Sequence, residues 1–136
     1  MRSWCGAAAI AALLVTGCGL DVQSPDLYQV TRSGPGGPAL TLLVNDAGTI
    51  SCDGGKPKSL PDPLLLQARD LATSLNADVK AKLRFPVSAR SVFSYTVKVQ
   101  NGTFTFPDTA AASRKELAQL ELFVVQAAAN PCGLSS

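Results

Sequence analysis

The chain has 136 residues, of which 46% are hydrophobic and 16% charged, and it contains no histidine. This length suits one small domain with a single core and leaves no room for a second. The absence of histidine excludes a Ser-His-Asp triad, a Cys-His pair, a histidine zinc site and a histidine acid–base, and a formal charge of +2 predicts no nucleic-acid surface.

The N-terminal segment has the three-part layout of an export signal. Arg2 supplies a positive charge, residues 7–15 form an unbroken apolar run, and the small residues Thr16 and Gly17 follow. The run is shorter than the roughly 20 residues that a permanent membrane-spanning helix needs. We therefore expect residues 1–17 to be a signal peptide. Since only one of the 12 Lys and Arg lies in it, the remainder carries 11 basic against 10 acidic residues.

The apolar run ends in an aliphatic residue, two small residues and a cysteine, Val15-Thr16-Gly17-Cys18. This pattern resembles the lipobox of bacterial lipoproteins. In that family the cysteine sulfur receives a diacylglyceryl group, and a peptidase then cuts immediately before the cysteine. The resemblance implies cleavage between Gly17 and Cys18, a covalent lipid on Cys18, and anchoring on the extracytoplasmic side of the cell membrane. An ordinary secretory signal with a cysteine nearby by chance is the alternative.

Residues 18–26 follow as the lipidated N-terminus and a tether. This stretch is rich in Gly, Asp, Gln, Ser and Pro and has little apolar content, which is typical of a flexible linker. The folded part of the exported protein is therefore expected to be a single small α+β domain over 27–136.

The first part of this domain predicts three strands, at 27–32, 39–44 and 49–52. A run of glycine and proline separates the first two, and the loop 45–48 is typical of a hairpin. In this hairpin Val44 is expected to face Ile50, and Leu42 to face Cys52. Cys52 would then point toward the core.

A helix is predicted after the third strand. Asp62 is expected to cap its free amides and Pro63 to occupy its first position. Phe85-Pro86 is expected to end it. Apolar residues recur at spacings of three and four, and we interpret this stripe as core packing rather than a ligand groove: Leu64, Ala68, Leu71, Leu75 and Val79.

A second hairpin is predicted from two alternating runs, 92–99 and 103–106, separated by Asn101-Gly102. Asn-Gly between such runs favours a type I′ turn. This turn would pair Val99 with Phe104 and Val97 with Phe106. Six apolar side chains would share one face of the sheet: Phe93, Tyr95, Val97, Val99, Phe104 and Phe106.

A second helix is predicted from a capping box formed by Ser113 and Glu116. Asn130-Pro131 is expected to stop it, which places Cys132 just past its end. Its apolar face is unusually wide, with Leu117, Leu120, Val124, Ala127 or Ala128, and also Leu122, Phe123 and Val125.

These elements predict an α+β fold in the order β-β-β-α-β-β-α, with an antiparallel sheet of about five strands and two helices packed on one face. The other face of the sheet would be open. It is expected to carry Thr41, Leu43, Ser94, Thr96, Lys98, Thr103 and Thr105.

The positions of the four cysteines support the interpretation that this protein is exported and lipidated. Cys5 leaves with the signal and Cys18 is lipidated, so Cys52 and Cys132 remain as a pair in an oxidising compartment. We expect a disulfide that closes a long loop and stabilises the domain by roughly 4 to 5 kcal/mol. Two buried free thiols are the alternative.

Little else in the sequence indicates chemistry, and we expect no catalytic residue, no metal site and no cofactor apart from the lipid. No Gly-rich loop joins a strand to a helix with the Lys-Ser or Lys-Thr of a phosphate loop. Asp46, Asp53, Asp62 and Glu116 stand singly at turns and helix starts. A hydrolase built on a carboxylate pair across the fold is the alternative.

The loop cations Lys56 and Lys58, together with Arg32, could form a basic rim facing anionic lipid. A solvated loop explains the same residues without a ligand. We favour this second interpretation.

Two segments are similar to emfourin-type inhibitors of thermolysin-like proteases: Val30-Thr31-Arg32-Ser33-Gly34, and Phe93-Ser94-Tyr95-Thr96-Val97-Lys98-Val99 with Asn101-Gly102 and the closing helix. The resemblance implies a protease inhibitor, although the lipid anchor and the disulfide depart from that family's pattern and no inhibitory residue carries over.

Three functions are therefore open. The leading one is a non-catalytic binding or accessory lipoprotein with a protein partner, contacted by the open sheet face or the turn-rich loops. Protease inhibition is the second. A structural or lipid-handling envelope factor is the third, and it would use the wide apolar face of the second helix.

Overall fold

A computed structural model describes residues 25–134. It contains a six-stranded sheet in the order β4-β3-β2-β1-β5-β6, and every neighbouring pair of strands is antiparallel. The elements are β1 (Asp26–Ser33), β2 (Leu40–Asn45), β3 (Thr49–Cys52), β4 (Lys58–Ser59), α1 (Asp62–Lys80), β5 (Ser94–Val99), β6 (Gly102–Pro107), a 3-10 helix η1 (Asp108–Ala112) and α2 (Lys115–Ala129). The expected α+β class is confirmed, with one strand more than the sequence indicated.

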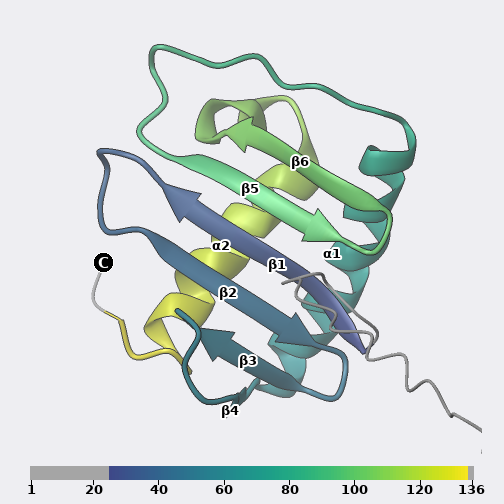
Figure 1. Ribbon diagram of the computed structural model, residues 1–136, viewed down its shortest axis with the longest axis vertical. Helices are drawn as coiled ribbons and strands as arrows, with labels where there is room; N and C mark the ends of the chain where they lie inside the picture. Colours follow the sequence, from purple (N-terminus) through teal and green to yellow (C-terminus); the bar gives the residue numbers. More distant parts are fainter. Residues whose placement is uncertain (1–24, 135–136) are drawn as a thin grey trace, which may run out of the picture.

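Both helices lie on the same side of the sheet, and the core fills the space between the two layers (Figure 1). The inner face of the sheet and the apolar stripes of the helices meet there, as the periodicity predicted. The largest fully buried side chains include Tyr28, Leu42, Ile50 and Phe106 from the sheet and Leu75, Leu117, Leu120 and Phe123 from the helices.

The first hairpin has the predicted register. Val44 pairs with Ile50, and Leu42 pairs with Cys52. The additional strand β4 pairs with the outer edge of β3 and is only two residues long. Pro57 and Pro61 flank it, so no alternating run was present to predict it.

The second hairpin keeps its predicted face but not its predicted register. Val97 pairs with Phe104 and Val99 with Gly102, so the type I′ prediction with Val99 opposite Phe104 is wrong by two residues. The turn falls on Gln100 and Asn101. Asn101 is not among the residues with positive φ, which a type I′ turn requires. The six apolar side chains still share one face, because a shift of two residues preserves the alternation.

Contacts with α1 decide this register. The backbone N–H of Asn101 donates to the side-chain oxygen of Asn76 at 3.1 Å. Gly102 has a φ of 149°, and a Cβ at this position would lie 3.0 Å from Val79 Cγ1. The glycine therefore allows the strand to approach the helix closely, instead of serving the turn itself.

Both ends of α1 differ from the prediction. Pro61 is the N-cap residue, and Asp62 is the first helical residue without a side-chain capping bond. The helix ends at Lys80, well before Phe85-Pro86. Lys82 has a φ of 55°, its N–H donates to Val79 O, and the N–H of Leu83 donates to Asp78 O. These two bonds form a Schellman motif with lysine at the position that usually holds glycine, so no sequence signal marked this end.

The predicted capping box of α2 is also wrong. Ser113 instead ends η1, where its N–H and its hydroxyl both donate to Ala110 O. Arg114 is the N-cap residue, without a side-chain capping bond, and Glu116 accepts a hydrogen bond from Arg114 Nε at 2.8 Å. The other end of the helix agrees with the prediction, because α2 stops at Ala129, directly before Asn130-Pro131.

The sheet face opposite the helices is open, as predicted, and carries mainly small polar side chains. Across four adjacent strands, Thr41 pairs with Thr31, Thr31 with Thr96, and Thr96 with Thr105. Thr31 and Thr41 hydroxyls lie 3.3 Å apart, and those of Thr96 and Thr105 lie 3.1 Å apart. The hydroxyl groups of these four threonines therefore form hydrogen bonds with one another in two pairs.

Candidate functional site

The structure contains one of the two predicted modification sites. Cys52 and Cys132 form a disulfide with Cα atoms 5.8 Å apart and 80 residues apart in sequence. It joins the end of β3 to the segment after α2, as expected. Gly17 and Cys18, the predicted cleavage and lipidation residues, lie outside the described residues.

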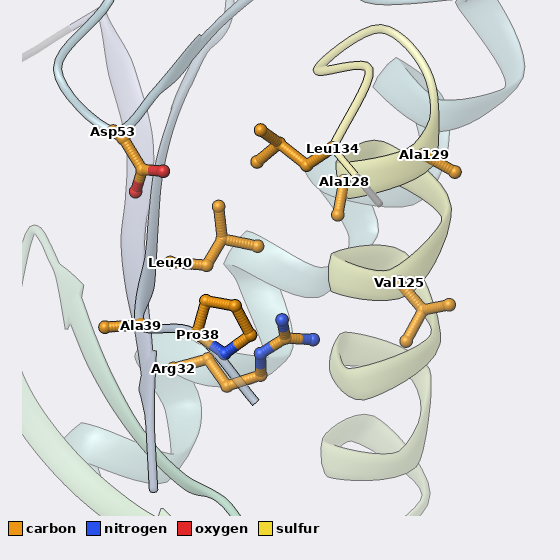
Figure 2. A pocket seen from close by; sticks show the side chains of 9 residues that line it. All are labelled: Arg32, Pro38, Ala39, Leu40, Asp53, Val125, Ala128, Ala129 and Leu134. Atoms are coloured by element: carbon orange, nitrogen blue, oxygen red, sulfur yellow. The ribbon is translucent and has the colours of Figure 1, made fainter. Parts of the chain in front are cut away.

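A pocket of about 300 Å³ lies next to this disulfide, between the start of β2 and the last turns of α2 (Figure 2). Its walls are mainly apolar. Leu40 and Leu134 point into the space between the two layers, and Val125 and Ala128 come from α2. Such a volume lies at the lower end of the range typical of small-molecule sites.

Arg32 is the cation of the pocket. It is on the inner face at the end of β1, and Figure 2 shows its guanidinium turned toward α2. Its carbon Cζ lies 4.6 Å from the centre of the Phe93 ring, which holds the guanidinium by a cation–π contact. Its Nε is buried without a hydrogen-bond partner, and Arg32 forms no ion pair within residues 25–134.

The charge of Arg32 also acts on a neighbouring tyrosine. Burial, followed by the nearby Glu121 carboxylate, raises the pKa of Tyr95 to about 12, while Arg32 opposes the rise. The basic rim of Arg32 with the loop lysines, which we did not favour from the sequence, is not supported by the contacts of Lys58, which donates to the carbonyls of Pro131 and Cys132. From the sequence we thus considered Arg32, but we did not predict that Arg32 lines a pocket and packs on Phe93.

The disulfide holds the two walls of the pocket together. Asp53 follows Cys52 on one wall, and Leu134 lies two residues beyond Cys132 on the other. Asp53 has a φ of 51°, and its Oδ1 accepts the N–H of Thr41 at 2.8 Å. The turn after β3 is therefore fixed to β2. The carboxylate of Asp53 stands at the end of the pocket away from Arg32 (Figure 2).

The fold does bring two carboxylates together elsewhere. Asp78 of α1 is 6% exposed, and Arg114 bridges it to Glu116 at 3.0 Å and 2.8 Å. Desolvation and then Glu116 raise the pKa of Asp78 to about 6. Desolvation acts to raise the pKa of Glu116, but hydrogen bonds from its own backbone, Asp78 and Arg114 outweigh it and lower this pKa below its ordinary value. These groups do not line the pocket, and we interpret them as a clamp between α1 and α2.

Glu121 of α2 is a second carboxyl that the sequence did not mark. Its Oε1 is buried without a hydrogen-bond partner among the described residues. Desolvation, with a smaller contribution from Asp108, raises its pKa to about 7. A carboxyl whose pKa is higher in the folded than in the unfolded chain stabilises the fold at acidic pH, and this contribution is lost as the pH rises through the folded-state value.

We expect Glu121→Gln to be more stable than the parent protein at pH 8, by about 1 to 2 kcal/mol after allowance for solvent screening. Its unfolding free energy should also fall less between pH 5 and 8, because the neutral amide does not lose a proton. Urea unfolding across this range tests it, with Asp70→Asn as an exposed control that should leave the profile unchanged. A variant less stable than the parent at pH 8 would contradict the prediction.

Two further findings describe this part of the chain. Within residues 25–134, no group of three or more acidic, histidine or cysteine side chains is arranged to hold a metal ion. No helix in the same range has the length and apolar character to cross a membrane.

The comparisons with known proteins returned no match. Neither the family models, nor the curated proteins, nor the solved structures gave a match to this chain. The resemblances to lipoproteins and to emfourin-type inhibitors therefore stay predictions.

Proposed function

We propose that this protein is a lipid-anchored, non-catalytic binding module on the extracytoplasmic side of the cell membrane, and that the pocket beside the disulfide is its binding site. The observation that supports it is Arg32, a cation that has no ion-pair partner among residues 25–134 and lies at one end of an apolar recess. The domain would be held near the membrane by a lipid on Cys18 and by a tether that ends before β1 begins at Asp26.

The chemistry of the pocket indicates its ligand. A buried N–H without a partner costs about 1 to 3 kcal/mol, and a bound anion would remove this cost. Guanidinium groups bind carboxylates through paired, charge-assisted hydrogen bonds. The walls from Leu40, Val125 and Leu134 favour an aliphatic group. A small carboxylate with an aliphatic tail fits both features.

The apolar wall that α2 contributes to this pocket favours a lipid-handling function as the second candidate. Val125 and Ala128 belong to the wide apolar face of α2 and line the pocket. A volume of about 300 Å³ admits a short aliphatic chain rather than a whole lipid. We therefore place lipid handling second to small-ligand binding.

Titration with octanoate, followed by NMR of the Val125 and Leu134 methyl groups, tests the site. Arg32→Gln is expected to weaken octanoate binding at least about tenfold, the worth of one charge-assisted contact. Octanol should bind parent and variant equally, because it has no carboxylate. Val125→Trp should fill the pocket while leaving Arg32 in place, and the side chain of Val125 is 52% exposed, so the substitution need not disturb the core.

The exposed Arg90 provides the matched control, since Arg90→Gln removes the same charge from a residue that does not line the pocket. Octanoate binding that is unchanged in both Arg32→Gln and Val125→Trp would refute the assignment of the pocket.

The lipid anchor is tested separately by Cys18→Ser. The variant is expected to lose palmitate labelling and to leave the membrane fraction, or to accumulate as uncleaved precursor. Cys5→Ser is the matched control and should behave like the parent, because Cys5 lies within the predicted signal. If Cys18→Ser still incorporates palmitate and stays membrane-bound, the anchor is not at this residue.

A further inference from the structure

The two edges of the sheet are very different. The edge at β4 is two residues long, includes Lys58 and is flanked by prolines, all features that discourage pairing with another strand. The opposite edge is β6, six residues long, in which threonine and phenylalanine alternate between Gly102 and Pro107. Only the β6 edge offers a strand of useful length.

The hydrogen-bond pattern shows which backbone groups of β6 face outward. The N–H of Asp108 donates to Phe93 O at 3.0 Å, which marks this pair as a bonded one. Bonded and non-bonded pairs alternate in an antiparallel ladder. Thr103 and Thr105 therefore stand in non-bonded pairs with Lys98 and Thr96, and their N–H and C=O groups point away from β5.

A groove of about 700 Å³ runs beside this edge, lined by Thr103 and Thr105 on one side. The connection from α1 to β5 forms the other side, and Figure 1 shows it passing on the β6 side of the sheet. Phe85 of this connection packs on Phe104, with ring centres 6.0 Å apart, and so fixes the groove wall to the strand.

The groove wall is positively charged. Lys82 and Arg84 line it, both are exposed, and neither forms an ion pair within residues 25–134. Val87, also in the wall, is 97% exposed and offers an apolar contact. No carboxylate is among the residues that line the groove.

We infer that the β6 edge binds an extended acidic segment of a partner protein, which adds to the sheet as a seventh strand. The outward N–H and C=O groups of Thr103 and Thr105 supply the main-chain hydrogen bonds. Lys82 and Arg84 select acidic side chains on the segment, and Val87 contacts an apolar one. This site is separate from the pocket beside the disulfide, so each can fail without the other.

A short acetylated peptide of alternating valine and glutamate is the probe. In the free protein, the Thr103 and Thr105 amides should exchange with solvent rapidly, since no hydrogen bond protects them. We expect saturating peptide to slow the exchange of both at least tenfold, with no change at Ser59 of β4, on the opposite edge. The same peptide with lysine in place of glutamate should give no protection.

Thr105→Pro removes an outward N–H without removing a bond to β5, and Pro107 already occupies the equivalent outward position. This variant should weaken peptide binding at least tenfold. Thr105→Val keeps the N–H and is the matched control, so its affinity should stay within about twofold of the parent. Lys82→Asn with Arg84→Gln should weaken binding about fivefold at low ionic strength. Asparagine tolerates the left-handed backbone of residue 82.

Two results would overturn the inference. The first is an acidic peptide that leaves Thr103 and Thr105 exchange unchanged at millimolar concentration. The second is sedimentation showing a dimer of the free protein that Thr105→Pro abolishes, because the edge would then be occupied by β6 of a second copy.

Discussion

Replacing Cys52 and Cys132 together by alanine is expected to lower the free energy of unfolding by about 4.5 kcal/mol, the chain-entropy value for a loop of this size. The bond joins residues 80 apart and so restricts most of the unfolded domain. This loss is a large share of the stability of a small domain, which lies at about 5 to 15 kcal/mol. Urea unfolding of the double variant and the parent gives the difference.

Reduction of the parent protein provides the control for this prediction. If the cross-link is responsible, the reduced parent and the double variant should unfold at similar urea concentrations. The pocket should loosen as well, because Asp53 and Leu134 flank the two cysteines on opposite walls. A double variant within 1 kcal/mol of the oxidised parent would contradict the entropic account.

Phe123→Ala is expected to lower the free energy of unfolding by about 3 to 5 kcal/mol, because it removes a fully buried aromatic side chain from the centre of the core. Phe123 meets Tyr28 edge to face, with ring centres 5.9 Å apart. The two rings join α2 to the middle of the sheet, so neither layer can close over the cavity without moving the other.

The neighbouring Leu122 is the matched control, since it is 53% exposed on the same helix turn. Leu122→Ala should cost less than about 1 kcal/mol, because little apolar surface is lost from the core. Equal losses in the two variants, measured by thermal or urea unfolding, would contradict this account, because alanine favours the helix at both positions and only Phe123 is packed in the core.

The sequence alone determined the features that depend on periodicity and short-range turn chemistry. The inward residues of β1, β2, β5 and the two helices follow from alternation at two residues or at three and four. The register of the first hairpin follows from its loop, which places Leu42 opposite Cys52. The disulfide was predicted because Cys52 and Cys132 are the two cysteines left once Cys5 and Cys18 are assigned to the signal and the lipid, and the inward position of Cys52 agrees with it.

The tertiary structure decided the features in which a distant contact competes with a local preference. Asn101-Gly102 favours a type I′ turn, but the bond to Asn76 and the close approach to Val79 shift the register by two residues. Lys82 ends α1 in a left-handed conformation that a local rule assigns to glycine. Local propensities are worth about 1 kcal/mol or less per residue, so a few packing contacts outweigh them.

The candidate site belongs to the second group. No pattern near Arg32 marks it as a ligand residue, because its pocket is assembled from β1, β2, the turn after β3 and the end of α2. The groove beside β6 likewise depends on which strand lies at the edge, and strand order is set by how the layers pack. The sequence therefore determined the core and the disulfide, and it predicts the lipid anchor, whereas the surfaces proposed to bind a ligand or a partner exist only once distant segments have come together.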